Sequence, residues 1–237
     1  MEFKLQKIKE DIFMISEPYF YEHGNIFLLK GNKFDLVIDS GIGLNNLKSF
    51  LVKNNFINTK LFITHSHFDH SGGINFFNLK DLIIKKRIIK NLKNKKLLAL
   101  EYLKPEDFNK KQVISSNIDV NKFYSNFNIK NIQKIKSFDK NIINNGIFSF
   151  KIIYTPGHTD DSYVLFDKIN KILITGDTLY NGAVYAEMTN SNKIKFIDSL
   201  EKIKKLEFEL VLGGHNNILN RDEAFSVIDN WIGKLKR

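Results

Sequence analysis

The chain has 237 residues, enough for one large domain or two small ones with a sizeable buried core. Its formal charge is +10, from 36 basic and 26 acidic residues, but most of the basic residues are lysines in a sequence also rich in asparagine and isoleucine. We therefore do not take the charge as a sign of nucleic-acid binding, although it would attract an anionic substrate. The absence of cysteine excludes disulfides and thiolate metal ligands.

The first residues of the chain contain no apolar segment that would act as a signal peptide and no small-residue cleavage site. No apolar run approaches the length that is needed to span a bilayer. These features predict a cytoplasmic protein with no membrane partner.

The first part of the chain predicts strands interrupted by one helix. The strand candidates are 11–16, 25–30, 34–39 and 60–64. Residues 44–54 place apolar side chains at helical spacing, at Leu44, Leu47, Phe50 and Leu51. Strand, helix and strand in this order predict an α/β unit.

The middle of the chain predicts an insertion of helices and loops at about 85–136. A short strand is expected at 81–84, and 85–100 alternates lysine with aliphatic residues at near-helical spacing before Pro105 breaks the pattern. The polar stretch 110–136 carries three aromatic residues that would either line an acyl pocket or, as we favour, pack in the core. They are Phe123, Tyr124 and Phe127.

The last part of the chain again predicts strands and helices. The strand candidates are 147–154, 162–166, 171–175 and 208–212, and the helix candidates are 195–206 and 222–235. We find no clear repeat, no linker and no heptad pattern. We therefore expect one domain over residues 1–237.

The segment from His65 to His70 has the pattern H-x-H-x-D-H. In an extended segment, side chains two residues apart point the same way, so His65 and His67 can face one cation together. Asp69 and His70 follow where the chain must turn, and the glycines after Ser71 support that turn. The turn lets these two side chains face a second point close to the first.

Three further potential ligands follow apolar runs that end in glycine. His158 comes after 152–157, Asp177 after 172–176 and His215 after 210–214. If these strands and the strand before His65 share a sheet and a direction, their ligands gather at one edge of that sheet. The glycines allow the backbone to turn sharply there.

These side chains form a set of nitrogen and oxygen ligands that suits zinc, with iron and manganese as open alternatives. Seven ligands exceed the four of a tetrahedral zinc site, so two metals fit better. Two metals about 3.5–4 Å apart can activate a bridging water for attack on a carbonyl or phosphoryl centre. The seven residues are His65, His67, Asp69, His70, His158, Asp177 and His215.

The ordered set, from Val37 to His215, resembles the metallo-β-lactamase-fold hydrolases. The resemblance implies an α/β fold, a four-layer αβ/βα metallo-β-lactamase sandwich with a dinuclear zinc site between two similar halves. It also implies a role for Asp39 in supporting the ligands. By the same resemblance, the first metal would be held by His65, His67 and His158, the second by Asp69, His70 and His215, and Asp177 would bridge them.

Several members of this superfamily do not match. The chain has no cysteine ligand, and the segment after Asp177 lacks the Gly-Cys-Gly-Arg-like sequence of glyoxalase II and persulfide dioxygenases. His67 stands where flavo-diiron proteins have glutamate, and the chain is too short for a β-CASP insertion. Segments 176–183 and 19–26 resemble a subgroup that includes acyl-CoA thioesterases. Tyr180 matches a tyrosine that contacts substrate in related lactonases.

We therefore expect a dinuclear zinc hydrolase that uses a metal-bridging hydroxide to cleave a thioester or other activated acyl ester of a small anionic molecule. Asp69 and Tyr180 are the expected catalytic residues. The alternatives are a lactonase or β-lactamase-like hydrolase, a metal-dependent nuclease or phosphodiesterase, and an iron-dependent persulfide dioxygenase-like oxidoreductase.

Less specific interpretations remain beside these. The H-x-H-x-D-H segment could be a structural or degenerate metal site, and Tyr180 could simply be a packed, half-buried tyrosine. The basic residues between Lys85 and Lys96 could contact coenzyme A phosphates or nucleic acid, but a solvated helix face is the simpler interpretation. We do not expect a nucleic-acid partner, and a homodimer is one open possibility for the oligomeric state.

Overall fold

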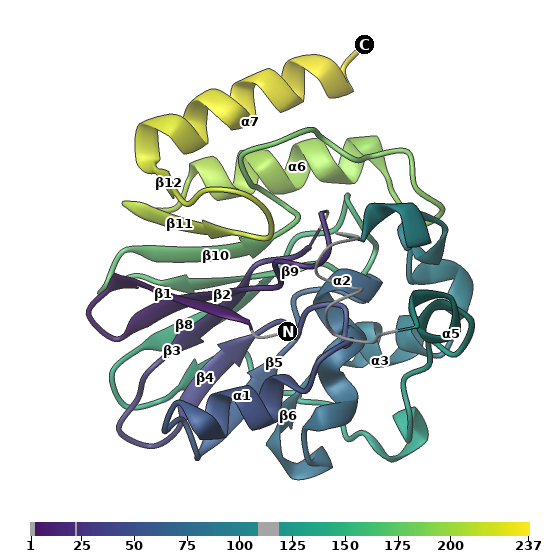
Figure 1. Ribbon diagram of the computed structural model, residues 1–237. Helices are drawn as coiled ribbons and strands as arrows, with labels where there is room; N and C mark the ends of the chain where they lie inside the picture. The colour runs from purple at the N-terminus through teal and green to yellow at the C-terminus, as the bar shows by residue number, and fades with distance from the viewer. Residues whose placement is uncertain (1–2, 22, 109–118) are drawn as a thin grey trace. The chain divides into compact units, whose positions relative to one another are not determined.

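The computed structural model describes residues 3–21, 23–108 and 119–237, so residues 109–118 of the predicted insertion lie outside the described residues. The chain divides into two compact units. Unit 1 comprises Met1–Lys30 and Phe34–Phe138, and unit 2 comprises Gly31–Lys33 and Asp139–Arg237. Each unit contains one six-stranded sheet (Figure 1). Whether the two units form the single domain expected from the sequence stays a prediction.

The sheet of unit 1 has its strands in sequence order. The four strands from β1 to β4 form an antiparallel meander, whereas β4, β5 and β6 run parallel to one another. All four residues of β3 are buried, as expected for a strand in the middle of a covered sheet. The strands are β1 (Lys4–Lys9), β2 (Ile12–Ser16), β3 (Ile26–Leu29), β4 (Asp35–Ile38), β5 (Thr59–Phe62) and β6 (Leu82–Ile83).

The parallel connection from β4 to β5 passes through α1 (Leu47–Lys53). Asn46 caps this helix, because its side chain accepts a hydrogen bond of 2.9 Å from the backbone N–H of Ser49. In the described part of unit 1, the other α-helices are α2 (Phe68–Ser71), α3 (Lys86–Leu92) and α5 (Val120–Ser125). The short 3₁₀ helices are η1 (Gly72–Phe76), η2 (Leu79–Asp81), η3 (Lys95–Leu97), η4 (Leu100–Tyr102), η5 (Pro105–Asp107) and η6 (Ile132–Lys134).

The sheet of unit 2 repeats this topology over its first five strands, whereas its sixth strand, β12, pairs antiparallel with β11. Its first four strands again form an antiparallel meander, and the fifth strand, β11, again pairs in parallel with the fourth, β10. This repeat was not visible in the sequence, because it lies in the pattern of strand pairing and not in the residues. The strands are β7 (Ile142–Asn144), β8 (Ser149–Tyr154), β9 (Tyr163–Asp167), β10 (Ile172–Gly176), β11 (Leu210–Gly213) and β12 (Leu219–Asn220).

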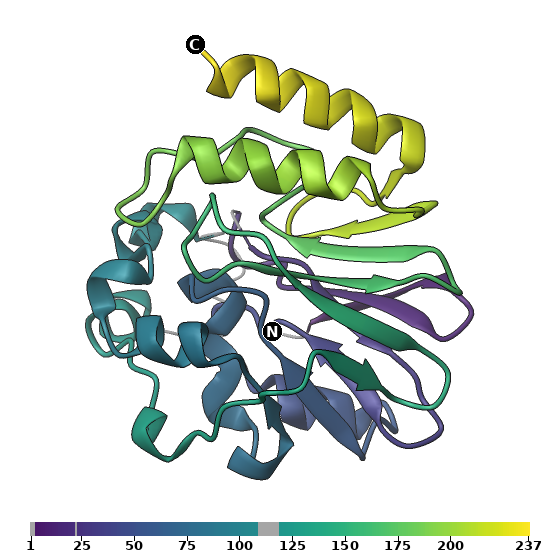
Figure 2. The same ribbon diagram turned by 180° about the vertical axis from the view of Figure 1, so that it is seen from behind.

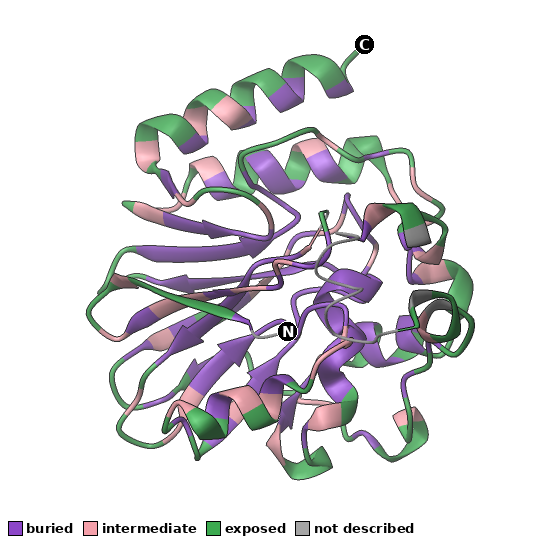
Figure 3. Cartoon of the chain, in the orientation of Figure 1, coloured by how far each residue is buried: buried purple, intermediate pink, exposed green. Residues whose placement is uncertain are grey.

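Two amphipathic helices, α6 (Lys193–Lys204) and α7 (Arg221–Leu235), lie side by side in unit 2 (Figures 1 and 2). Each buries one stripe of residues and exposes the opposite face (Figure 3). Phe196 and Trp231 pack edge to face with ring centroids 5.9 Å apart, inside a core that also contains apolar residues of β9, β10 and β11. This core fixes the strand ends from which the predicted ligands of unit 2 emerge.

Most of the elements predicted from the sequence are confirmed within one to three residues at their ends. The strands β1, β7 and β12 were not predicted, since they are short or largely exposed and carry little alternation of apolar and polar side chains. In the part of the chain that the structure describes, no helix is both long and apolar enough to cross a bilayer.

Candidate metal centre

The first group of predicted ligands lies at one edge of the sheet in unit 1. Because β4 and β5 are parallel, Asp39 and Thr64, which follow them, emerge at the same edge. Asp39 has a left-handed backbone (φ 62°) and a buried carboxylate. This carboxylate accepts hydrogen bonds from the Thr64 N–H (2.7 Å), the Thr64 hydroxyl (2.8 Å) and Nδ1 of His70 (2.8 Å). Asp39 therefore connects the two strand ends to the histidine cluster.

The turn predicted after His67 is a short helix. His67 is extended (ψ 151°) and precedes α2, which carries Asp69 and His70 and continues into η1. His65 lies close to both of its neighbours, with ring centroids 4.7 Å from His67 and 4.3 Å from His70. Nε2 of His70 is 3.3 Å from an oxygen of Asp69. The structure thus brings the four predicted ligands of unit 1 together.

The second group lies at one edge of the sheet in unit 2. Since β9 is antiparallel to both β8 and β10, and β11 is parallel to β10, the strands before His158, Asp177 and His215 all run in one direction. The condition that all four ligand-bearing strands share one sheet is not met, because the strand before His65 belongs to the sheet of unit 1. The sequence at the end of a strand does not show which sheet that strand joins, so the division into two sheets could not be predicted from it.

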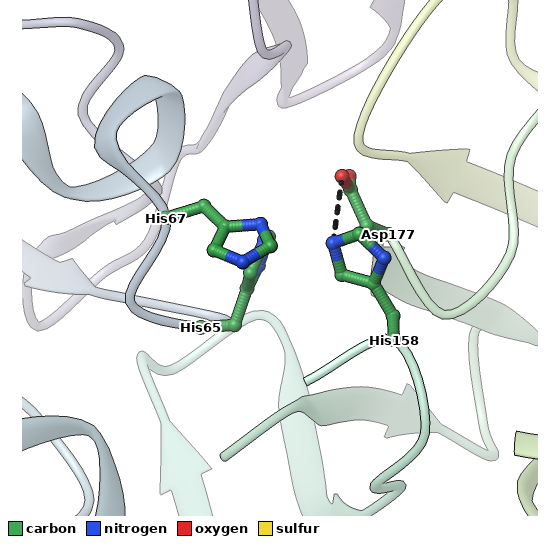
Figure 4. A group of neighbouring side chains, drawn as sticks. All are labelled: His65, His67, His158 and Asp177. Atoms are coloured by element: carbon green, nitrogen blue, oxygen red, sulfur yellow. Dashed lines mark ion pairs between the residues drawn. The ribbon is translucent and has the colours of Figure 1, made fainter. Parts of the chain in front are cut away.

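Asp177 lies between the two histidines of unit 2. One of its oxygens, Oδ2, is 3.4 Å from Nε2 of His158 and 3.3 Å from Nε2 of His215. Figure 4 shows the ion pair of His158 with Asp177 as a dashed line. A single carboxylate oxygen therefore faces two imidazole nitrogens, the arrangement expected of a ligand shared by two metals.

Three histidines are held by hydrogen bonds at Nδ1. His70 donates from Nδ1 to Asp39, and His158 donates from Nδ1 to the backbone carbonyl of Tyr185 at 2.9 Å. Nδ1 of His65 is 3.0 Å from the Thr64 hydroxyl, which gives its own proton to Asp39 and so can only accept from the ring. In each ring Nε2 is then the nitrogen with a lone pair for a metal.

The spacing of the ligand atoms tests whether a metal fits. Zn–N and Zn–O bonds of about 2.0–2.2 Å at a tetrahedral angle place two ligand atoms about 3.3 Å apart. The pairs His70–Asp69, His158–Asp177 and His215–Asp177 are separated by 3.3, 3.4 and 3.3 Å. Direct N–H···O hydrogen bonds are usually shorter, with a mode at about 2.9–3.0 Å. The described residues therefore fit a divalent first-row metal.

Two glycines let the backbone approach the ligands. A Cβ at Gly214 would lie 2.1 Å from Oδ1 of Asp177, and one at Gly24 would lie 2.7 Å from the Asp69 carbonyl and 3.0 Å from the His70 ring. Any side chain at either position would displace a ligand. The sequence prediction noted the glycine before His215 but missed the role of Gly24, which precedes β3 and has no ligand next to it in sequence.

A buried carboxyl group that the sequence prediction also missed, Glu17, supports the same region. It accepts hydrogen bonds from the Tyr19 hydroxyl (2.6 Å) and the Ile42 N–H (2.8 Å), and so connects the end of β2 to the loop after Asp39. Burial raises the pKa of Glu17 to about 7, although the two hydrogen bonds oppose that rise. Burial likewise raises the pKa of Asp39, and the neighbouring His70 opposes it.

Tyr180 is buried beside the ligands of unit 2. Its ring lies 5.2 Å from the ring of His215 and 5.1 Å from that of Trp231, and its hydroxyl donates a hydrogen bond of 2.5 Å to the carbonyl of Ala183. The structure thus gives this side chain a packing role. The predicted contact with substrate stays a prediction.

Residues 21–215 match the family described as the metallo-beta-lactamase superfamily. The match covers most of the chain and includes all seven predicted ligands, so the chain belongs to this superfamily. The predicted fold class, α/β with the metallo-β-lactamase fold, is confirmed. So is the prediction of an enzyme: the chain is a metal-dependent hydrolase.

Curated relatives with similar sequences include two kinds of hydrolase. The chain is 28% identical over 255 residues to the acyl-coenzyme A thioesterase MBLAC2 of Homo sapiens, a match that covers 97% of this chain and 86% of the relative. It is 29% identical over 212 residues to the hydroxyacylglutathione hydrolase of Francisella tularensis subsp. novicida, a match that covers 88% of this chain and 64% of the relative.

Solved structures with the same fold include two more distant proteins. A metallo-beta-lactamase from Pontibacter korlensis matches with a TM-score of 0.70 at 13% identity and covers 100% of both chains. A metallo-beta-lactamase family protein from Thermus thermophilus matches with a TM-score of 0.71 at 15% identity, over 97% of this chain and 81% of the other.

Proposed function

We propose that this protein is a dinuclear zinc hydrolase that cleaves acyl thioesters of the acyl-coenzyme A type. The observation that carries the two-metal part is the single oxygen of Asp177, 3.3–3.4 Å from two imidazole nitrogens. The substrate part is supported by the names of the relatives, since an acyl-coenzyme A thioesterase and a hydroxyacylglutathione hydrolase both act on small thioesters. The alternatives stay a lactonase or β-lactamase-like hydrolase, a nuclease or phosphodiesterase, and a persulfide dioxygenase-like oxidoreductase.

The proposal assigns the ligands of units 1 and 2 to a common centre. His65, His67 and His158 would hold one metal, Asp69, His70 and His215 would hold the other, and Asp177 would be shared. Zinc is proposed because the set contains only imidazole and carboxylate groups, with iron or manganese as the alternatives. When bound, such ions supply Lewis acidity and lower the pKa of a coordinated water.

The side chains of the protein would then position the reacting groups and transfer a proton between them. Asp69 would accept a proton from the attacking water, whose oxygen forms the new bond to the thioester carbon as the C–S bond breaks. The same proton would pass to the departing thiolate, so that an acid and a thiol leave. Asp39 keeps His70 in one tautomer through its 2.8 Å hydrogen bond, and the Tyr180 hydroxyl would contact the substrate.

The test is a substrate panel on protein purified without chelator and assayed for metal content. We expect close to two metals per chain and hydrolysis of an acyl-coenzyme A or a glutathione thioester in preference to a lactone, a β-lactam or a phosphodiester. Full activity in metal-free protein would refute the metal proposal. Turnover of the phosphodiester alone would refute the substrate proposal and favour a nuclease.

The cytoplasmic location expected from the sequence stays a prediction. The homodimer, which the sequence left open, stays a possibility to be tested.

A further inference from the structure

The most basic part of the described chain lies in unit 1, on α3 and η3. Seven of the twelve residues from 85 to 96 are lysine or arginine, against 36 of 237 in the whole chain, and no acidic residue occurs between Asp81 and Glu101. Lys85 is used within the fold, because it donates a hydrogen bond to the carbonyl of Phe138. The five exposed lysines of this stretch call for a separate explanation.

Helix α3 separates its charges from its apolar residues. Ile88, Ile89 and Leu92 are buried, and the opposite side of the helix carries exposed cations. We call five of the exposed lysines of α3 and η3 the lysine face. They are Lys86, Lys90, Lys93, Lys95 and Lys96.

The lysine face carries uncompensated charge. Among residues 3–21, 23–108 and 119–237, no carboxylate forms an ion pair with any of its five lysines. Lys86 and Lys90 are four residues apart and Lys90 and Lys93 three, spacings at which like charges on a helix destabilise it. An anion bound here would relieve that repulsion, so the charge pattern favours a ligand with several negative charges.

The two residues that follow the lysine face, Leu97 and Leu98, accept hydrogen bonds from the segment His65–His70, which we call the histidine loop. The backbone N–H of Phe68, which follows His67, donates to the carbonyl of Leu98 at 2.9 Å. The hydroxyl of Ser66 donates to the carbonyl of Leu97 at 3.5 Å. Since successive Cα atoms are 3.8 Å apart, Lys96 lies within about 8 Å of Leu98 along the chain. The C-terminal end of the lysine face is therefore directly followed by the backbone that contacts the histidine loop.

We propose that the lysine face binds the phosphate groups of a nucleotide-bearing acyl thioester, and so selects substrates of the acyl-coenzyme A class over thioesters that lack phosphate. This inference rests on the proposed thioester hydrolysis and adds the group that is recognised. A long neutral arm separates the thioester of such a substrate from its phosphates. That shape matches a cationic surface that borders the histidine loop but lies on other elements, α3 and η3.

The direct test is binding of adenosine 3′,5′-bisphosphate to the full chain, measured by calorimetry at low and moderate salt. The triple variant Lys90→Gln, Lys93→Gln and Lys96→Gln keeps a polar side chain at each position and removes three charges. We expect it to bind the bisphosphate at least tenfold more weakly, and the affinity of the wild-type protein to fall as salt rises. The matched control, Lys4→Gln, Lys7→Gln and Lys9→Gln, removes three exposed charges from β1 of the same unit and should bind as the wild type does.

A kinetic comparison separates this inference from the proposed function. An acyl-coenzyme A and the acyl-pantetheine with the same acyl group share the thioester but differ in the phosphates. The lysine-face variant should raise KM at least tenfold for the first and leave kcat/KM within twofold for the second. If neither thioester is hydrolysed, the proposed function fails, but the bisphosphate titration still decides the inference.

Three results would overturn the inference. They are equal bisphosphate affinity in the two triple variants, an equal loss of activity toward both thioesters, and a clear preference of the lysine face for an RNA oligonucleotide over the bisphosphate.

Discussion

At the scale of single residues, the carboxylate of Asp177 carries the two-metal proposal. Asp177→Asn keeps the shape of the side chain but removes its charge and one acceptor oxygen. We expect at least one metal per chain to be lost, and kcat/KM to fall at least a hundredfold, about 2.7 kcal/mol of transition-state stabilisation. Metal analysis and thioesterase kinetics measure both effects.

The matched control for this change is Asp198→Asn, the same substitution at an exposed position on α6 of the same unit. It should retain metal and activity. An Asp177→Asn protein with a full complement of metal would contradict the bridging role.

The buried carboxyl group of Glu17 predicts a pH dependence of stability. Its pKa is about 7 in the folded chain and about 4.5 when exposed, so the folded state binds a proton more tightly than the unfolded state. Its contribution is therefore fully present below about pH 4.5 and is lost as the pH rises to about 7, by ~3 kcal/mol in total. Glu17→Gln cannot titrate, and the wild-type protein should lose more unfolding free energy over this range than the variant does.

Urea unfolding at a series of pH values measures this difference, and Glu101→Gln, at an exposed position of unit 1, is the control. Parallel pH profiles for wild type and Glu17→Gln would mean that Glu17 is charged in the folded protein.

The hydroxyl of Tyr180 has two possible uses, which Tyr180→Phe separates. The ring, packed between His215 and Trp231, is retained, while the hydrogen bond to Ala183 is lost at a cost of about 1 kcal/mol in stability. If the hydroxyl also contacts substrate, kcat/KM should fall about tenfold at temperatures where the variant is fully folded. Reduced stability with unchanged kinetics would leave Tyr180 with a packing role alone.

At the scale of elements, α7 offers a test of how unit 2 is held together. Asn220 and Glu223 form a capping box, in which the Asn220 side chain accepts from the Glu223 N–H at 3.0 Å and Glu223 accepts from the Asn220 N–H at 2.8 Å. Asn220→Ala should cost about 1 kcal/mol in the free energy of unfolding. Asn230→Ala, exposed in the same helix, should have little effect or stabilise the helix slightly. Equal urea midpoints for the two variants would contradict the capping role.

The elements were largely predictable from the sequence because most strands and helices here follow simple patterns. Helix α1 has apolar residues at helical spacing, and β8, β10 and β11 are apolar runs that end near glycine. The helix α2 was not predictable, since four residues are too few to show a helical period. The division of the strands between two separate sheets depends on contacts far apart in sequence, which no local pattern reports.

In the candidate site, too, the residues that follow a local sequence pattern were predicted and those that act through distant contacts were not. The seven proposed ligands could be picked out from the sequence, because histidine and aspartate in a fixed order at strand ends are conspicuous. Glu17 and Gly24 were not, since each acts through neighbours that only the fold supplies. The roles of Thr64 and Tyr185 in holding histidine rings were missed for the same reason, the second because it acts through its backbone carbonyl.

At the scale of the whole molecule, metal binding should stabilise the fold. Ions that bind only the folded state add RT ln(1 + [L]/Kd), or about 2.7 kcal/mol per site at a hundredfold excess over Kd. Chelation should therefore lower the urea midpoint of the wild-type protein, and added zinc should restore it. Asp177→Asn should respond less. An unchanged midpoint on chelation would contradict metal binding to the folded state.

The hydrogen bonds that hold Nδ1 of His65, His70 and His158 bear on how the protein would take up its metal ions. Rings that are fixed by their neighbours need not reorient when an ion arrives, so uptake would consist mainly of exchanging the ion's hydration shell for imidazole and carboxylate. Repeated rounds of stripping and refilling should then leave the backbone unchanged, and the empty protein should be a competent acceptor without a chaperone to shape it.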